Sequence, residues 1–255
     1  MRPVIESALD RYSLQTIEGC TPGIQEAMRY SLRSPGKRIR PLLTLMAADA
    51  CGGDPERALP AACAVEMIHV FSLIHDDLPA MDDDDMRRGK PSSHKVFGEG
   101  EAILAGDALL TLAFQIIAED VRPPEVAVHC ASALARSVGA CGMQGGQWDD
   151  LRQHPERSSV AKRKTGALME AALHLGALTA QATPVQISAL REFGQRVGMA
   201  FQLIDDALDG EGGEVEAMKL QARTLTDEAI RNLLPLGAKA QVLIDLAQQL
   251  VQRTH

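Results

Sequence analysis

The amino-acid sequence predicts an all-α fold: a single-domain antiparallel bundle of about ten helices around a central cavity, spanning residues 1–255. Apolar residues make up 45% of the chain but aromatic residues only 3%, and this mixture favours helices over sheets. Proline and glycine divide the chain into apolar blocks of helix length with short connections, which is typical of a bundle. Because we find no repeat and no flexible linker, we expect one domain with a substantial core.

The boundaries of the predicted helices follow from these breaks. The breaks are SPGK at 34–37, GGDP at 52–55, the region of Pro79, RGKPSS at 88–93, RPP at 122–124 and TP at 183–184. The sequence therefore predicts helices over residues 3–18, 22–33, 39–51, 56–77, 100–119, 124–147, 157–181, 185–209, 215–233 and 236–252. No segment shows a convincing strand pattern.

Charge and cysteine spacing limit the classes of function. The net charge of −8 argues against a nucleic-acid partner. The five cysteines are widely spaced and form no CxxC pair, which indicates free thiols in a reducing cytoplasm rather than a zinc or redox site. The best apolar run, Ala102 to Ala118, contains Asp107 and is too short to span a membrane, and the N-terminus lacks the apolar core of a signal peptide. We therefore expect no stable membrane insertion.

The predicted helix that ends at Asp77 carries polar residues on one face. Val65, His69, Ser72 and Asp76 recur at helical spacing and share that face. The rest of the helix is apolar, and polar groups are costly to bury without a partner. This stripe indicates that the helix borders a functional cavity.

A first acidic cluster lies in DDLPAMDDDDMRRGKP, from Asp76 to Pro91. Asp76 and Asp77 end a helix, because Pro79 disfavours helical geometry at Leu78. The six carboxylates within ten residues repel one another. A hard cation such as magnesium relieves that repulsion, and magnesium prefers oxygen ligands completed by substrate phosphate. The alternative is a solvated acidic loop.

A second acidic cluster lies in FQLIDDALD, from Phe201 to Asp209. Asp205 and Asp209 are four residues apart and face the same side of a helix, and Gln202 joins that face. Like charges at this spacing destabilise a helix unless a cation binds them. The alternative is an ordinary exposed helical face.

Three basic groups complement the two acidic ones. Arginine forks match the oxygens of a phosphate group in bidentate fashion. The three groups are Lys37, Arg38 and Arg40, then Arg87 and Arg88, then Lys162, Arg163 and Lys164. Any one basic pair is usually a solvated surface feature, but together the five groups indicate a diphosphate substrate bridged by metal.

The sequence resembles the trans-isoprenyl diphosphate synthase (polyprenyl synthetase) family, especially its bacterial farnesyl diphosphate synthases. The matching segments are GKRIRP, EMIHVFSLIHDDLPAMDDDDMRRGKP, ILAGDALLTLAF, GGQWDDL, KTGAL and GMAFQLIDDALD. They run in order from Gly36 to Asp209. The resemblance implies the helical bundle of the isoprenoid synthase fold, a magnesium-dependent prenyltransferase and a homodimer.

The resemblance also implies the magnesium ligands. Those on the allylic diphosphate would be Asp76, Asp77 and Asp82. A further ion would be held by Asp205 and, more weakly, by Asp206 and Asp209. The metals and cations would draw diphosphate off the allylic substrate, and the double bond of isopentenyl diphosphate would attack the resulting carbocation with loss of a proton.

The resemblance implies the substrate contacts in the same way. The allylic diphosphate, or the oxygen that departs with it, would contact Arg87, Lys164, Thr165 and Gln202. Isopentenyl diphosphate would be bound by Lys37, Arg40, His69 and Arg88. Phe71, five residues before Asp76, would form the floor of the hydrocarbon pocket, with Ser72 leaving room above it; this is the bacterial farnesyl (C15) pattern. Simple core packing of Phe71 is the alternative.

The sequence departs from the family after the second acidic cluster. The family usually has a Gly-Lys pair and a further Asp there, whereas Asp209 is followed by GEGGEVEAMK. Lys219 is the candidate replacement for that lysine, and residues 210–218 are expected to be poorly ordered or to mark an omitted loop. Trp148 is expected to pack beside the pocket, and Asp150 to orient basic residues.

Four other functions are compatible with parts of this pattern. A geranylgeranyl diphosphate synthase or a catalytically weak regulatory subunit of a heteromeric synthase would share most motifs. A class I terpene cyclase would share the aspartate cluster, but cyclases use aromatic walls and this chain has only eight aromatic residues. The pair His75 and Asp76 resembles the HD pair of a metal phosphohydrolase, but the remaining histidines are scattered.

Overall fold

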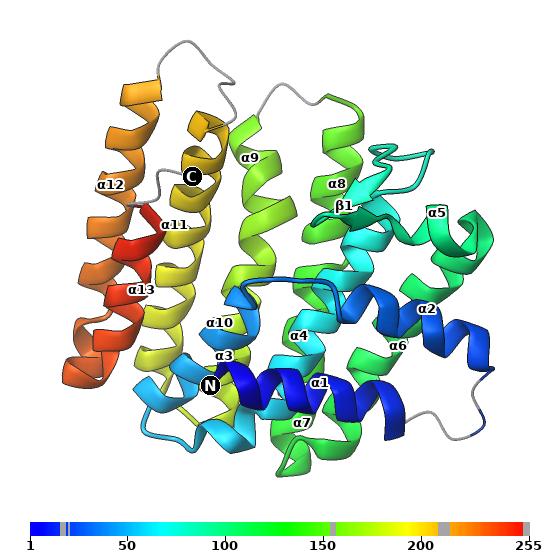
Figure 1. Cartoon of the computed structure of the whole chain (residues 1–255). Helices are drawn as coiled ribbons and strands as arrows, with labels where there is room; N and C mark the ends of the chain where they lie inside the picture. Colours follow the sequence, from blue (N-terminus) through cyan, green and yellow to red (C-terminus); the bar gives the residue numbers. More distant parts are fainter. Residues whose placement is uncertain (16–18, 20, 154–156, 209–214, 252–255) are drawn as a thin grey trace.

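The computed structural model describes residues 1–15, 19, 21–153, 157–208 and 215–251. Regular structure in these residues is almost entirely helical (Figure 1). The α-helices are α1 (Arg2–Gln15), α2 (Pro22–Leu32), α3 (Ile39–Ala50), α4 (Pro55–Asp76), α5 (Ser93–Phe97), α6 (Glu99–Asp120), α7 (Pro124–Val138), α8 (Met143–Leu151), α9 (Arg157–Ala161), α10 (Ala167–Thr179), α11 (Pro184–Leu208), α12 (Val215–Asn232) and α13 (Gln241–Val251). The other elements are a π-helix η1 (Lys162–Gly166), a 3₁₀-helix η2 (Leu234–Ala240) and the strands β1 (Met86–Arg87) and β2 (Lys90–Pro91).

The predicted all-α bundle is confirmed. The long helices α4, α6, α10, α11 and α12 run along a common direction, and α1 and α2 lie across them (Figure 1). Within the described residues, a large cluster of buried apolar side chains draws on helices along the chain, from Ile5 of α1 to Leu250 of α13. The helices therefore share a core.

Several parts of the described chain differ from the predicted elements. The block expected over 236–252 is the 3₁₀-helix η2 as far as Ala240 and α13 from Gln241, and α5 has no predicted counterpart. The block expected over 124–147 is divided between Gly139 and Gly142 into α7 and α8. The block expected over 157–181 is interrupted by η1. After Asp85, β1 pairs with β2 in an antiparallel hairpin, with Met86 opposite Pro91. Strands of two residues are too short to show an alternating pattern, so no sequence signal predicts them.

Helix α4 lies at the centre of the bundle and packs against α3, α6 and α10. It begins with Asp54 as N-cap, whose side chain accepts a hydrogen bond of 2.9 Å from the backbone N–H of Glu56. It ends at Asp76, two residues before the Leu78–Pro79 bond, as predicted. Most of its residues are buried, and a helix that is apolar on nearly all sides belongs in a core.

Three helical stretches of the described residues are long and apolar enough to cross a membrane, judged by length and composition: Pro55–Asp76, Glu99–Asp120 and Pro124–Leu151. The prediction that no segment reaches this length is therefore wrong. It counted only the run from Ala102 to Ala118, whereas α6 extends over 22 residues. In the first stretch 67% of the most apolar window is buried inside the bundle, because α4 uses its apolar surface for packing.

The π-helix η1 lies between α9 and α10 and carries Lys164 and Thr165. Short π-helical turns inside helices are frequent at functional sites, because they shift the direction of side chains on one turn. Gly146 of α8 allows this turn to approach closely, since a Cβ atom there would lie 2.4 Å from the backbone nitrogen of Lys164. The glycine therefore brings α8 and η1 into direct contact.

Candidate active site

A cavity of about 400 Å³ lies along the C-terminal half of α4. Its walls come from α4, the segment after it, α8 and η1: Phe71, Ser72, His75, Asp76, Met81, Met143, Gln144, Gln147, Trp148, Leu151 and Lys164. Asp76 and Lys164 supply charge, while most of the remaining lining is apolar. Phe71 is 5% exposed, and its ring meets the His75 ring edge-on at 4.8 Å between centroids. An apolar chamber with charged groups in its lining suits a hydrocarbon that carries an anionic head.

A second cavity, of about 530 Å³, lies beside the middle of α4 and is markedly more polar. It is lined by Pro35, Gly36, Lys37, Arg38, Ile39, Arg40, Glu66, His69, Arg88, Thr165, Phe201, Gln202 and Asp205. All four residues predicted to bind isopentenyl diphosphate line this cavity. The concentration of cationic groups suits a diphosphate.

Helix η1 connects the two cavities through consecutive residues. Lys164 lines the first cavity, and its Nζ donates a hydrogen bond of 2.6 Å to Asp150 of α8. Thr165 lines the second, and its Oγ1 donates to Oε1 of Gln202 at 3.1 Å. Asp150 therefore orients a basic residue, as the sequence predicted.

Asp76 lines the first cavity, and Asp82 lies close to it in the loop after α4. The backbone N–H of Asp82 donates to the carbonyl of Asp76 at 2.8 Å, which holds the two residues close together. Burial, opposed by Lys164 and reinforced by the nearby Asp82, raises the pKa of Asp76 from its ordinary 3.8 to about 6. A half-buried carboxylate with a second carboxylate nearby is a fitting ligand for a divalent cation, so these residues fit magnesium.

Asp77 differs from Asp76 in its surroundings. Its carboxylate is buried and accepts hydrogen bonds of 2.8 Å and 2.5 Å from Nε and Nη2 of Arg87. Arg87 also bonds to Asp84 at 2.6 Å. Asp77 and Arg87 line neither of the two cavities described above, but a smaller one near Tyr30. The structure thus places the predicted metal ligand and the predicted diphosphate contact together in an ion pair that holds the loop after α4.

The cationic groups of the second cavity surround His69. Nη2 of Arg88 lies 3.2 Å from Nε2 of His69, and because a guanidinium only donates, Nε2 is the acceptor. Burial, reinforced by Arg40 and Arg88, holds the pKa of His69 well below its ordinary value, so the ring is neutral. The Nε atom of Arg40 is buried without a hydrogen-bond partner. An anion in the cavity would satisfy that donor.

The basic residues at the start of α3 serve different purposes. Arg38 is 4% exposed and bonds to Glu66 at 2.8 Å and to Glu6 at 2.9 Å, so it stabilises the core. Lys37 and Arg40 line the cavity, as predicted. Gly36 leaves room for Arg88, because a Cβ atom at Gly36 would lie 2.6 Å from Nη1 of Arg88.

The second acidic cluster contributes unequally. Asp205 lines the second cavity with Gln202. Asp206 accepts a hydrogen bond of 2.8 Å from Nε2 of Gln202. Asp209 and residues 210–214 of the stretch 210–218, where poor order or a gap was expected, lie outside the described residues. For residues 215–218 the expectation is wrong, because they form the first turn of α12. Lys219 on α12 donates to Glu216 at 3.2 Å and is absent from the described linings of both cavities, so its role as a replacement stays a prediction.

Gln147 was not among the site residues predicted from the sequence. Both polar atoms of its side chain are buried without a hydrogen-bond partner, and the residue lines the first cavity. Its position in GGQWDDL, one of the segments that match the family, was the sequence signal that could have identified it. Trp148 was expected to pack beside the pocket; it lines the first cavity, although 60% of its surface is exposed. The Arg152 guanidinium lies over its ring, with Cζ 4.5 Å from the ring centroid.

This chain is similar in sequence to known proteins. Residues 21–230 match the polyprenyl synthetase family. A farnesyl diphosphate synthase of Geobacillus stearothermophilus is 49% identical over 84% of this chain and 74% of its own length. A geranylgeranyl diphosphate synthase of Cyanophora paradoxa is 41% identical over 91% of this chain and 88% of its own.

Solved structures agree with the sequence comparison. The fold superimposes on an FPP/GFPP synthase of Zymomonas mobilis with a TM-score of 0.91 at 36% identity, covering 98% of this chain and 96% of the other. A geranylgeranyl pyrophosphate synthetase of Geoglobus acetivorans gives 0.88 at 28% identity, with 99% of both chains covered. Family match, sequence identity and shared fold lead to one conclusion. The chain belongs to the polyprenyl synthetase family and is a trans-prenyltransferase.

Proposed function

We propose that this chain condenses isopentenyl diphosphate with an allylic diphosphate, dimethylallyl or geranyl, to give farnesyl diphosphate. The observation that carries the proposal is the pair of cavities joined at Lys164 and Thr165. One has a mainly apolar lining with Asp76 among its charged groups, and the other is lined by Lys37, Arg40 and other cationic groups. Two diphosphates of different tail length suit these two environments.

In this proposal the allylic substrate occupies the first cavity. Its hydrocarbon tail contacts Phe71 and its diphosphate faces Asp76 and Lys164. Asp76, Asp82 and Asp205 would hold magnesium, with Asp77, Asp206 and Asp209 as the further ligands implied by the resemblance. Bound magnesium would supply the positive charge that stabilises the leaving diphosphate.

Isopentenyl diphosphate occupies the second cavity, where Lys37, Arg40 and Arg88 bind its phosphate oxygens. The allylic C–O bond breaks, and the electron pair leaves with the diphosphate, to which Lys164 donates. The isopentenyl double bond then forms the new C–C bond with the allylic carbon, and the resulting cation loses a proton to the released diphosphate. The neutral His69 accepts from Arg88 and so fixes the direction of that guanidinium.

The C15 product is inferred from Phe71. This ring is buried below Asp76 on α4, and at about 1.5 Å per residue it lies roughly 7–8 Å along the helix from the carboxylate. A ring at that depth limits the growth of the tail. Because relatives include both farnesyl and geranylgeranyl diphosphate synthases, a C20 product is the second candidate.

We also propose that the chain acts as a homodimer in the cytoplasm, without inserting into a membrane. The support is the apolar surface of α6 and α7, where Ile103, Leu104 and Val128 are 42%, 59% and 67% exposed. Two copies paired through these helices would cover that surface.

Product analysis of the purified chain tests the function. The chain is incubated with magnesium, labelled isopentenyl diphosphate and either dimethylallyl or geranyl diphosphate, and the products are separated by chain length. The proposal requires farnesyl diphosphate as the main product from both starters. A mainly C20 product would make it a geranylgeranyl diphosphate synthase. Absence of product from the chain alone would favour a regulatory subunit, for which the missing Gly-Lys pair is the supporting observation.

A further inference from the structure

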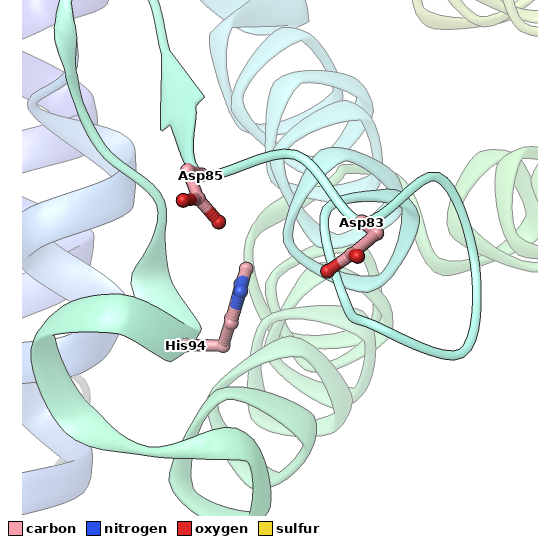
Figure 2. A group of neighbouring side chains, drawn as sticks. All are labelled: Asp83, Asp85 and His94. Atoms are coloured by element: carbon pink, nitrogen blue, oxygen red, sulfur yellow. The ribbon is translucent and has the colours of Figure 1, made fainter.

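Asp83, Asp85 and His94 lie together outside the two cavities. Each offers one ligand atom, and these three atoms lie within 4.8 Å of one another. Figure 2 shows the His94 ring between the two aspartates, whose carboxylates both point toward it. The aspartates belong to the loop between α4 and β1, and the histidine to α5.

His94 distinguishes this group from an ordinary acidic loop. Its side chain is 7% exposed, and both ring nitrogens are buried without a hydrogen-bond partner. Buried polar atoms normally have a partner, and an orphaned one calls for an explanation such as a missing ion. The ring nitrogen faces two carboxylates, so a cation at this point would satisfy all three groups.

The backbone holds the two aspartates in place before any ion binds. The N–H of Asp83 donates to the carbonyl of Leu78 at 3.1 Å, and the N–H of Ser92 donates to the carbonyl of Asp85 at 2.9 Å. Asp85 also accepts from Nζ of Lys95 at 2.7 Å. A carboxylate has two oxygens and about four lone pairs, so Asp85 can keep Lys95 and still offer a ligand atom.

The ligand types indicate which ion fits. Magnesium prefers an octahedral set of oxygens and dehydrates reluctantly, whereas imidazole suits zinc and other divalent transition metals. One imidazole and two carboxylates leave at least one position of a tetrahedral zinc ion for water. Zinc–ligand distances of about 2.0–2.2 Å put neighbouring ligand atoms of a tetrahedral site roughly 3.4 Å apart, which falls within the 4.8 Å that contains these three atoms.

We propose that Asp83, Asp85 and His94 form a binding site for a divalent transition metal ion of the Zn²⁺ type, separate from the magnesium ligands of the active site. The ion would connect α5 to the loop that carries Asp82. Its effect would be to hold this loop in one arrangement while substrates come and go.

Zinc binding to the full-length chain tests the proposal. Titration calorimetry with Zn²⁺ is performed in excess magnesium, so that the aspartates facing the cavities are not the ones measured. We expect one Zn²⁺ per chain and a raised melting temperature. We expect Asp83→Asn, Asp85→Asn and His94→Gln each to weaken binding by more than about tenfold, since even changes to outer-shell partners cost 10–100-fold. Asp227→Asn, an exposed change on α12, is the matched control and should leave the affinity unchanged.

Co²⁺ in place of Zn²⁺ identifies the ligands. Visible absorption bands typical of nitrogen ligation should form with the wild-type chain and disappear in His94→Gln. If the buried His94 variant does not fold, the two aspartate variants, which change exposed residues, decide the matter. Wild-type protein that binds no zinc in magnesium, or variants that bind it as tightly as the control, would overturn the proposal and leave His94 as an imidazole held between carboxylates.

Discussion

Arg87 donates two hydrogen bonds to the buried carboxylate of Asp77, at 2.8 Å from Nε and 2.5 Å from Nη2. The adjacent Asp76 instead lines the cavity with Lys164. Two neighbouring aspartates of one motif therefore have different surroundings. The first faces the substrate cavity, whereas the second fastens the loop that follows α4.

This difference predicts opposite effects on stability. Asp77→Ala removes both hydrogen bonds from Arg87, which keeps only the exposed Asp84 as a partner, and should lower the free energy of unfolding by about 1.5–3 kcal/mol. Asp76→Ala, measured in the same urea titration at pH 7 without magnesium, should instead raise it, because no ion pair is lost and the cost of burying the ionised carboxylate is relieved. Equal losses for the two variants would show that Asp77 has no separate structural role.

The raised pKa of Asp76 predicts a pH dependence with a definite sign. Its folded pKa is about 6 against an ordinary 3.8, so the folded chain binds more protons than the unfolded chain between these values. This contribution to stability is therefore lost as pH rises through that window. Asp76→Asn removes it, so without magnesium the variant should gain stability relative to wild type between pH 4 and pH 7.

His69 titrates in both wild type and Asp76→Asn. The difference in the free energy of unfolding between these two proteins therefore reports on Asp76. The depressed pKa of His69 lowers stability as pH falls below about 6.5, where the unfolded chain takes up a proton. Magnesium should stabilise wild type more at pH 7 than at pH 5. A pH-independent difference between wild type and Asp76→Asn would contradict the assigned burial of this carboxylate.

Phe71 is predicted to set the product length. Phe71→Ala removes the ring that meets His75 in the lining of the first cavity and should shift products from C15 toward C20 or longer. Leu190→Ala is a suitable control, because Leu190 is fully buried in the core and absent from the described lining of this cavity. An unchanged product spectrum in Phe71→Ala would exclude this residue as the floor.

The exposed apolar residues of α6 and α7 predict a dimer. Sedimentation at micromolar concentration should give twice the 27.4 kDa mass of the chain. Leu104→Glu should shift it toward monomer, because a charge would be buried at the interface. A wild-type chain that sediments as a monomer would refute the dimer.

Much of this architecture could be predicted from the sequence, because Pro and Gly mark where helices stop. Pro79 fixed the end of α4, and the paired carboxylates at Asp76 and Asp205 indicated which helix ends border the site. These signals are local. They depend on backbone geometry and charge, which the residues themselves carry.

The features that could not be predicted depend on contacts between distant segments. Arg38 and Arg40 look alike in GKRIRP, yet Glu6 and Glu66 draw only Arg38 into the core. The π-helical turn at Lys164 depends on close contact with Gly146. His94 meets Asp83 only because the hairpin after α4 folds back. None of these partners is adjacent in sequence.

The most direct test of the proposed mechanism is the turnover of Asp76→Ala and Asp205→Ala, with geranyl and isopentenyl diphosphate in saturating magnesium. Each change removes one carboxylate from the set that would place positive charge on the leaving diphosphate. Removing one such stabilising group costs about 10²–10³ in rate, so both variants should lose at least that much while keeping the wild-type circular dichroism spectrum. Near wild-type turnover in either variant would contradict the assignment of that aspartate to the active site.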